Sequence, residues 1–528
     1  MTRSLNYVLA ALAGASLPVW EGPIAWWPPA DPIPDPSAVE LRRRFTYATS
    51  HQRLGTFDRH ALPERRLRRL IGRLCARLGL TPSGGRSLFC LVSLLLGMRP
   101  AAGAKLRLHP PAFGDRIAVR IDVERGCAHI DYGAFLLIDA AHAPDNGTAL
   151  PATHTFIKAL PVCIVEALRA WLAVRPDAAT LGELCGCSAP AGTDVLDDER
   201  EIGRLRSTAH RTLNGLAAFA LRIGLDRYNA SLVATTPQLC HRARMYYVHS
   251  DTNQLVDDLN RFYGELGLGP AYPVTTLVPF GSRVVPSDAQ VESVFEELRK
   301  TLDELRLPCR YGLDALIAFH NFFMLAAATL LVFMLGLREA KVLDLSAARV
   351  VAEAKTCDVD DETSGDSPRC LPVLLGPLAR EQIERIWEHM REVDRRAALL
   401  GVSEAVPWRA HLRAVLRGDD VPLLFEIQRI KARPIGTTRL CDLLPSERRW
   451  VANAGRHYWQ TFFTVQRFLS EAIDRWARHG PAGLELCSSI DVYVEDAVVE
   501  PLLEAQRAKA DQLRIRAFRG FVTRRGFS

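Results

Sequence analysis

One apolar run constrains this chain more than any other feature. It extends from Phe322 to Leu337 without a charged residue and leads directly into Arg338. A helix that crosses a bilayer needs about 20 apolar residues, and upstream of Phe322 the pattern is broken by His320 and Asn321. The run is therefore predicted to be a helix buried in a protein core, and no membrane association is expected.

The composition suits a soluble globular protein. The chain has 528 residues, of which 48% are hydrophobic and 24% are charged, and this length exceeds what a single core usually organises. Its 12 cysteines lack the paired spacing typical of zinc sites, so no metal and no cofactor is expected. Free thiols suit a reducing cytoplasm. The start, "MTRSLNYVLAALAGAS", is also similar to a secretory signal, so export is an alternative to the cytoplasmic location.

Three segments are expected along the chain. Residues 1–45 form a leader rich in Pro and Trp, residues 46–275 an N-terminal helical domain, and residues 276–528 a C-terminal domain. The boundary lies in the Pro- and Gly-rich stretch from Gly267 to Pro286. Helical periodicity prevails on both sides of it, which predicts a mainly α fold with small antiparallel β-hairpins.

Two hairpins are predicted from short strand-like runs. Arg116–Ile138 alternates apolar and polar residues around a turn at "ERGC". Arg349–Asp358 and Ser367–Leu375 are predicted to be two strands that flank an acidic turn. Each hairpin follows an apolar helix that ends on an arginine, Arg99 or Arg338.

An ordered set of polar residues begins at the end of the apolar run. Arg338 stands in "LGLREAKVLDL", and Lys355 lies in the second hairpin. Arg456 follows in "NAGRHYW", His479 in "DRWARHG" and Tyr493 in "DVYVED". Two guanidiniums can hold the non-bridging oxygens of a phosphodiester, a lysine can protonate the departing oxygen, and a tyrosine can attack phosphorus. This chemistry requires neither a metal nor ATP.

These motifs resemble those of the tyrosine recombinases, the phage-type integrases, over about Ala289–Val494. "NAGRHYW" resembles the family's His-x-x-Arg-His box with Asn453 in place of the first histidine, and the interval from Arg456 to His479 matches the family's interval. The resemblance implies a recombinase-like catalytic domain in the C-terminal half. It implies a site-specific recombinase or integrase that breaks and rejoins DNA through a phosphotyrosine intermediate. The catalytic residues that it implies are Arg338, Lys355, Asn453, Arg456, His479 and Tyr493.

Two departures from the family pattern leave a second function open. Asn453 can hydrogen-bond a phosphate but cannot transfer a proton, and Tyr493 lies further from His479 than the family's tyrosine usually does. The alternative is a catalytically inactive recombinase-fold protein that binds DNA or acts as an accessory protein of a mobile element. Arg369 and Lys431 are alternatives to the hairpin lysine.

The expected partner is double-stranded DNA. Basic residues gather in the C-terminal arm, Pro501–Ser528, which suits a phosphate backbone, although a solvated tail has the same charge pattern. The resemblance also implies self-association as a tetramer on DNA, or association with partner recombinases. The residues expected to contact DNA are Arg338, Arg456, His457, Arg514, Arg516 and Arg524.

The N-terminal half has a weak similarity in sequence pattern to the C-terminal half. Aligning Gly97 with Gly336 places the apolar helices and hairpins in register, each followed by a Leu-Pro step into a helix, at Leu160-Pro161 and at Leu371-Pro372. The hypothesis is that Ser87–Tyr247 is a degenerate repeat that binds DNA or a partner. Its equivalents of the first arginine, the second arginine and the nucleophile region would be Arg99, Arg206 and Tyr246-Tyr247.

Overall fold

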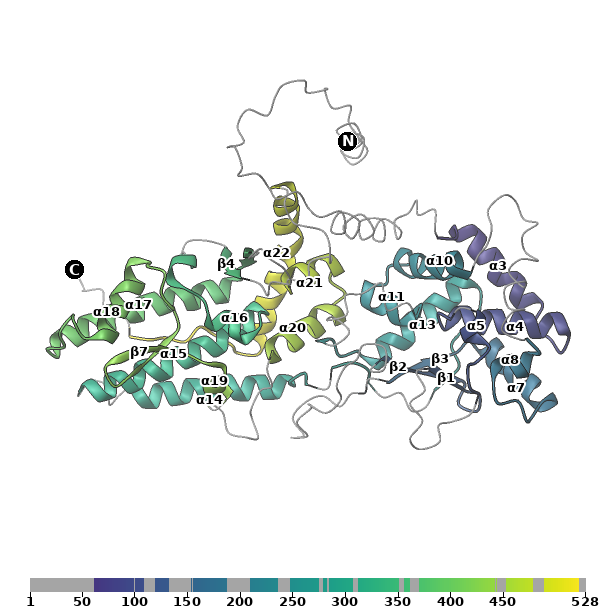
Figure 1. The fold of residues 1–528 in the computed structure, drawn as a ribbon, viewed down its shortest axis with the longest axis horizontal. Helices are drawn as coiled ribbons and strands as arrows, with labels where there is room; N and C mark the ends of the chain where they lie inside the picture. Colours follow the sequence, from purple (N-terminus) through teal and green to yellow (C-terminus); the bar gives the residue numbers. More distant parts are fainter. Residues whose placement is uncertain are drawn as a thin grey trace, which may run out of the picture. The chain divides into compact units, whose positions relative to one another are not determined.

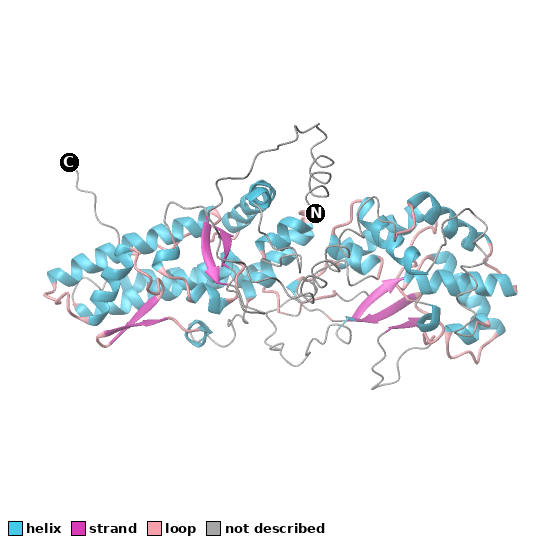
Figure 2. Cartoon of the chain, turned by 45° about the horizontal axis from the view of Figure 1, so that its top comes forward, coloured by secondary structure: helices cyan, strands magenta, loops and turns pink. Residues whose placement is uncertain are grey.

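The computed structural model describes most of the chain beyond residue 60, and every structural statement below concerns that part. The described residues are 61–98, 100–108, 119–132, 153, 155–187, 209–235, 247–274, 279–282, 284–306, 312–350, 356–360, 370–441, 443, 453–477 and 489–521. The structure is 61% helix, and its sheets are small and antiparallel (Figure 2). The prediction of a mainly α fold with small β-hairpins is confirmed.

The N-terminal half begins with two packed helices and ends with a helix that precedes the predicted boundary (Figure 1). In order, its elements are α3 (Glu64–Ala76), α4 (Pro82–Leu95), α5 (Pro100–Gly103), β1 (Val119–Asp122), β2 (Cys127–Asp131), β3 (Thr155–Ala159), α7 (Val162–Val174), α8 (Leu181–Cys185), α10 (Ala209–Arg222), α11 (Arg227–Val233) and α13 (Thr252–Leu266).

The C-terminal half has longer helices and two separate hairpins (Figure 1). In order, its elements are α14 (Asp288–Arg306), α15 (Leu313–Leu335), α16 (Glu339–Leu343), the short helix η5 (Ala347–Arg349), β4 (Thr356–Asp360), β5 (Cys370–Leu374), α17 (Pro377–Leu399), α18 (Pro407–Arg417), β6 (Phe425–Gln428), β7 (Lys431–Pro434), α19 (Thr437–Cys441), α20 (Ala454–Val465), α21 (Ser470–Trp476) and α22 (Ser489–Gln512).

The first predicted hairpin is part of a three-stranded sheet. β1 pairs with β2 antiparallel, with Asp122 opposite Cys127, so the predicted turn at "ERGC" is confirmed. The Asp122 carboxylate accepts the backbone N–H of Arg125 and thereby closes the turn. The third strand, β3, pairs with β2 and was not predicted.

The second predicted hairpin is confirmed as an antiparallel pair, β4 and β5, but the predicted start of its first strand was wrong, because Arg349 lies in the short helix η5 and β4 begins at Thr356. The predicted Leu-Pro step from Leu371-Pro372 into a helix was wrong. Pro372 lies within β5 opposite Asp358, and the helix α17 begins only at Pro377, after Gly376. A proline is tolerated in this two-stranded sheet because an edge strand does not need every backbone N–H.

The hydrophobic core divides in two between the halves. One cluster of buried side chains runs from Leu62 to Phe280, and the other from Val285 to Phe521. The division falls inside the Pro- and Gly-rich stretch Gly267–Pro286. Each half of the chain therefore organises a core of its own.

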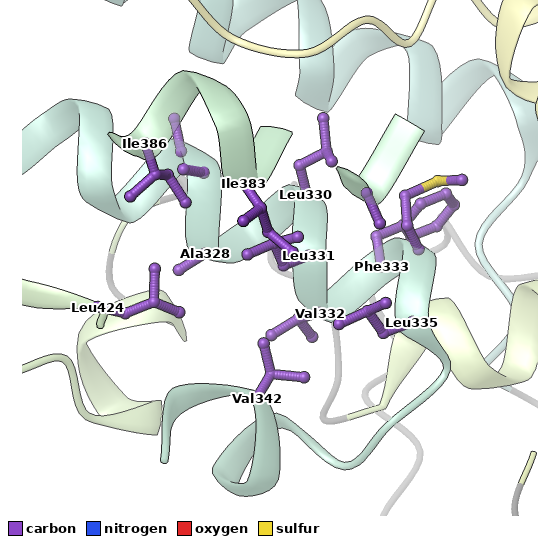
Figure 3. Packing of buried hydrophobic residues seen from close by; sticks show 14 of the residues in the cluster. Ala328, Leu330, Leu331, Val332, Phe333, Leu335, Val342, Ile383, Ile386 and Leu424 are labelled. Atoms are coloured by element: carbon purple, nitrogen blue, oxygen red, sulfur yellow. The ribbon is translucent and has the colours of Figure 1, made fainter. Parts of the chain in front are cut away.

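Helix α15 is the centre of the second core. Among the described residues it is the one helix long and apolar enough to cross a membrane, and 78% of its most apolar window is buried by the protein itself. In Figure 3 its side chain Leu331 lies beside Ile383 of α17, Val332 beside Val342 of α16, and Ala328 on the side of Leu424. Each fully buried Leu or Ile stabilises the fold by about 1.5–3 kcal/mol. The prediction of a buried helix is confirmed.

The predicted start of this helix was wrong. α15 begins at Leu313, so His320 and Asn321 lie inside it. His320 Nδ1 is 3.2 Å from Nε2 of the equally buried His389. The Asn321 amide donates to the carbonyl of Ile427 at 2.9 Å and accepts that residue's N–H at 2.7 Å. These polar residues therefore fit a buried helix because their hydrogen bonds are made by α17 and β6.

Candidate functional site at converging helix ends

Arg338 stands at the turn that follows α15. The helix ends at Leu335, and Gly336 then adopts a left-handed conformation with φ of 61°. A Cβ on Gly336 would collide with the indole ring of Trp476, so both the backbone and the close approach require glycine. Arg338 is the N-cap residue of α16, and its side chain is exposed. The turn thus presents this arginine at the end of a buried helix.

Arg456 comes from the first turn of α20. Asn453, at φ 65°, precedes the helix. Gly455 lies so close to the backbone of Phe333 that a Cβ would collide with it, which allows α20 to cross α15 at close range. The Arg456 side chain is only 7% exposed, and its Nη2 donates to the carbonyl oxygen of Ala477.

Three helix ends therefore meet beside the two arginines. Gly336, just beyond α15, packs on Trp476, the last residue of α21. The next residue, Ala477, accepts the hydrogen bond from Arg456 at the start of α20. The negative end of the α21 dipole favours a cation at this place. Arg338 follows Gly336 by two positions, so the fold brings both predicted arginines to one junction.

The β4–β5 hairpin approaches the same junction. β4 contacts α16, the helix that Arg338 caps, and Lys355 immediately precedes β4 in the sequence. The alternative lysine, Lys431, is elsewhere. It stands at the turn of β6–β7, whose residue Ile427 is held by Asn321. From there to the end of α15 the helix rises about 21 Å. This placement disfavours Lys431 as a partner of Arg338.

The His457 side chain is buried and contacts other side chains instead of solvent. Its Nδ1 is 2.7 Å from the Oγ of Ser282, and its ring meets that of Tyr247 edge-on, with centroids 4.6 Å apart. Burial lowers the pKa of His457 to about 3, so the imidazole is neutral at physiological pH. In this arrangement His457 is not available to DNA.

A segment of the N-terminal half covers this face of α20. The ring of Tyr247 lies 4.8 Å from the Cζ of Arg456, and the backbone N–H of His249 donates to the Thr461 hydroxyl at 2.9 Å. These contacts join residues far apart in the sequence, and no local signal predicted them. Tyr247 therefore acts as a packing partner of the second arginine.

An ion pair between an exposed arginine and a buried carboxylate extends the same contact. Arg467 Nη2 lies 3.0 Å from Asp258 Oδ1, and the Asn229 amide donates to the other carboxylate oxygen. Burial raises the pKa of Asp258 to about 6, against the opposing effect of Arg467. The carboxylate is thus held by one cation and one amide.

Several predicted residues are not placed by the structure. The side chain of Tyr493 is not described, although its helix α22 packs against α21. Arg514 and Arg516 follow α22 and are exposed. The residues that lie outside the described part of the chain are Lys355, Arg369, His479, Arg524, Arg99, Arg206 and Tyr246.

One group of side chains in the described part of the chain has metal-ligand chemistry. Ligand atoms of Asp122, Cys127 and His129 all lie within 4.8 Å of one another on the β1–β2 hairpin. However, the Asp122 carboxylate already closes the turn through the N–H of Arg125, whose guanidinium is 3.8 Å away. Burial also raises the pKa of Cys127 to about 12, which keeps the thiol protonated. The group is better explained as a turn.

No known protein family, curated protein or solved structure matches this chain.

Proposed function

We propose that this protein is a cytoplasmic DNA strand transferase of the tyrosine-recombinase type. Its substrate is double-stranded DNA, which it breaks and rejoins as a recombinase or integrase of a mobile element. It acts as a tetramer on DNA or together with partner recombinases.

The observation that carries this proposal is the junction of α15, α20 and α21. Arg338 and Arg456 lie far apart in the sequence, and the junction brings them to neighbouring helix ends. His479 follows Ala477 by two positions in the sequence. Tyr493 belongs to α22, which packs on α21. The meeting of the helix ends that carry Arg338 and Arg456 supports the proposal.

The two arginines, the tyrosine and the lysine have three different chemical roles. Arg338 and Arg456 bind the non-bridging oxygens and stabilise the charge that develops as phosphorus is attacked. The Tyr493 hydroxyl gives up its proton to water as its oxygen forms the bond to phosphorus, and the 5′ oxygen of the next nucleotide leaves and takes a proton that Lys355 donates. The phosphotyrosine bond conserves energy, so a second strand end can reverse the step.

A suicide DNA substrate tests this proposal, because a nick beside the scissile phosphate lets the leaving fragment diffuse away and traps the adduct. Wild-type protein should become covalently attached to the labelled strand. Tyr493→Phe removes one hydroxyl and should abolish the adduct without weakening DNA binding. The matched control is Tyr272→Phe, because Tyr272 packs against Arg169 in the N-terminal half.

Two outcomes of this experiment would count against Tyr493 as the nucleophile or against an intact fold. An adduct that persists in Tyr493→Phe would assign the attack to another residue. Equal losses in Tyr493→Phe and Tyr272→Phe would indicate damage to the fold and not to the chemistry.

A second candidate function is DNA binding without cleavage. Two observations favour it: the Arg456 guanidinium is largely buried between Ala477 and Tyr247, and Asn453 cannot transfer a proton. Wild-type protein that binds its target DNA but forms no adduct on a suicide substrate would support this function.

A further inference from the structure

A large cavity lies in the C-terminal half, away from the helix junction. Its volume is about 730 Å³, within the usual range for ligand sites. One wall is the second half of α14, and the other walls are the start of α17, the end of α22 and the arm Leu513–Phe521 that follows it. We call this cavity the arginine groove. Its arginines are Arg299, Arg306, Arg507, Arg514, Arg516 and Arg519.

The arm is fixed in place from the side of α14. The Arg299 guanidinium donates to the carbonyl of Arg514 at 2.9 Å, and that of Arg306 to the carbonyl of Arg519 at 2.5 Å. Two arginines of the helix therefore hold the backbone of two arginines of the arm. The basic arm predicted from the sequence is thus packed as far as Phe521.

The arm is also anchored to α17. The backbone N–H of Phe518 donates to Oε1 of the buried Gln382 at 2.7 Å, and that of Phe521 to Nδ1 of His389 at 3.2 Å. The Phe521 ring stacks on Phe319, with centroids 4.3 Å apart. Along the same segment Ile515 and Phe518 are buried whereas Arg516 and Arg519 are exposed, as expected where neighbouring side chains of an extended segment point to different sides. The exposed arginines therefore project from a rigid support.

The arginine groove has an excess of positive charge. Its lining contains six arginines but three carboxylates, those of Asp303, Glu381 and Asp511. Asp303 lies 3.4 Å from Arg306, and Asp511 lies 3.9 Å from Arg507. Within the described part of the chain, no carboxylate pairs with the side chains of Arg514, Arg516 and Arg519. These guanidiniums are available to an anion.

Phosphate suits this arrangement because a guanidinium can donate two parallel hydrogen bonds to it. Several arginines spread along an arm and a facing helix suit several linked phosphates better than a single one. The apolar floor, which includes Leu302 and Phe518, lowers the local dielectric and strengthens each contact. Nucleic-acid backbone supplies phosphates at regular short intervals.

The arginine groove is distant from the helix junction. Phe295 of α14 meets Phe333 near the end of α15, with centroids 5.4 Å apart, whereas Arg306 lies over Phe319. The two helices are therefore antiparallel, and Phe319 and Phe333 are separated by about 21 Å of helix rise. Duplex DNA rises about 3.4 Å per base pair, so this length corresponds to about six base pairs.

We propose that the arginine groove is a second phosphate-binding site, which holds the backbone of DNA flanking the strand-transfer position. The choice of DNA as the ligand rests on the proposed function. The alternative occupant, an acidic protein segment, is an outcome of the test.

The test is the salt dependence of binding to a fluorescent DNA duplex of non-specific sequence. Arg516→Gln combined with Arg519→Gln removes two charges and leaves the backbone anchors from Arg299 and Arg306 in place. Each lost phosphate contact should reduce the slope of log K against log salt by about 0.9, so the slope should fall by about 2 and the affinity at 0.1 M salt by about tenfold or more. The charge-matched control is Arg429→Gln with Arg433→Gln, which are exposed around the β6–β7 turn and should leave the slope unchanged.

The proposal is overturned if the double variant and the control have the same slope, or if the wild-type protein does not bind duplex DNA. Binding of labelled polyglutamate that depends on Arg516 and Arg519, with an unchanged DNA slope, would assign the groove to an acidic protein segment. Unfolding temperatures equal to wild type verify the fold of each variant. The adduct experiment tests strand transfer independently. A salt slope that depends on Arg516 and Arg519, without an adduct, would support the arginine groove and contradict strand transfer. An adduct with no change of slope in the double variant would support strand transfer and contradict the groove.

Discussion

The two halves of the molecule end their buried helices in the same way but use the resulting junctions differently. Gly97 follows α4 at φ 65°, and Gly336 follows α15 at φ 61°. A Cβ on Gly97 would collide with the backbone of Thr235, just beyond the short helix α11, and one on Gly336 would collide with Trp476 at the end of the short helix α21. In each half a hairpin and a long helix lie between these elements in the sequence.

The basic side chains at the two junctions differ in their surroundings. In the N-terminal half, the fully buried Lys158 reaches from β3 and its ammonium donates to the carbonyls of Leu95 and Val233 and to the hydroxyl of Thr235. This lysine ties the ends of α4 and α11 together. In the C-terminal half the comparable place presents the exposed Arg338. The basic group of one junction is fully buried and that of the other is exposed.

This difference agrees with the hypothesis that the N-terminal half is a degenerate repeat that does not cut DNA. All three donors of the Lys158 ammonium are used by acceptors of the protein, so none is left for a phosphate. In both halves an apolar helix is followed by a short helix and an antiparallel sheet, but within the described residues only the C-terminal half has a second hairpin, β6–β7. The repeat remains a prediction, which the variants below can sharpen.

The largest contrast is expected between the two arginines that end the apolar helices. Arg338→Ala should slow adduct formation about 10²- to 10³-fold, because it removes a donor that stabilises the transition state. Its side chain is exposed, so the unfolding temperature should be unchanged. Arg99→Ala, the counterpart in the N-terminal half, should leave the rate near wild type. Equal rates in the two variants would remove the functional distinction between the junctions.

Substitutions of the two glycines should destabilise the protein to a similar degree, whereas those of the two arginines should differ in their effect on adduct formation. Gly97→Ala and Gly336→Ala each force a Cβ into a neighbour at positive φ, which should lower the free energy of unfolding by about 2–4 kcal/mol. Gly267→Ala separates the two causes, because Gly267 has φ of 79° but no atom within 4 Å of its Cβ position. Gly267→Ala should lower the free energy of unfolding by about 1 kcal/mol. Chemical denaturation measures all three, and a cost at Gly97 or Gly336 no larger than at Gly267 would contradict the tight packing.

Replacing the closing lysine should affect stability and not catalysis. Lys158→Met removes the donor that the Val233 carbonyl and the Thr235 hydroxyl accept from, whereas the Leu95 carbonyl still accepts from Thr235. It should lower the free energy of unfolding by about 1–3 kcal/mol. Adduct formation by the folded variant should be unchanged. A loss of adduct at wild-type stability would show instead that the N-terminal junction takes part in the reaction.

Lys158 also predicts a pH dependence. Burial lowers its pKa from 10.5 to about 7 in the folded protein. Between those values the unfolded chain binds the proton and the folded protein does not, so stability should rise with pH, by at most about 1.4 kcal/mol per pH unit. Denaturation at pH 6.5, 8 and 9 should show this rise in wild type and a smaller rise in Lys158→Met. Parallel pH profiles would contradict the buried position of the lysine.

The smallest effect concerns Tyr247, which the repeat hypothesis aligned with the nucleophile. Tyr247→Leu removes the ring beside Arg456 and His457 and should cost about 0.5–2 kcal/mol. Tyr247→Phe keeps the ring and should be close to wild type in both stability and adduct formation. Loss of the adduct in Tyr247→Phe would make this hydroxyl part of the chemistry.

Local patterns in the sequence predicted the elements better than their contacts. The apolar run identified α15, but His320 and Asn321 were interpreted as a break because their partners, His389 and Ile427, lie far along the chain. The same limit explains the missed strand β3, which joins the first hairpin after a long connection. Hydrogen bonds between distant segments leave no local pattern.

The candidate site was predictable only in part. The order of motifs identified Arg338 and Arg456, and the structure brings their helix ends together. The burial of Arg456 and His457 could not be predicted, because Tyr247 reaches them from the other half of the chain and Ser282 from the stretch that connects the halves.

The most direct measurement of the central claim is to identify the residue that carries the DNA. Wild-type protein trapped on a suicide substrate is digested with protease and nuclease, and the peptide that retains a nucleotide is sequenced by mass spectrometry. Strand transfer by the C-terminal junction predicts a nucleotide on Tyr493, at the start of α22. A nucleotide on Tyr246 or Tyr247 of the N-terminal half, or no modified peptide at all, would contradict it.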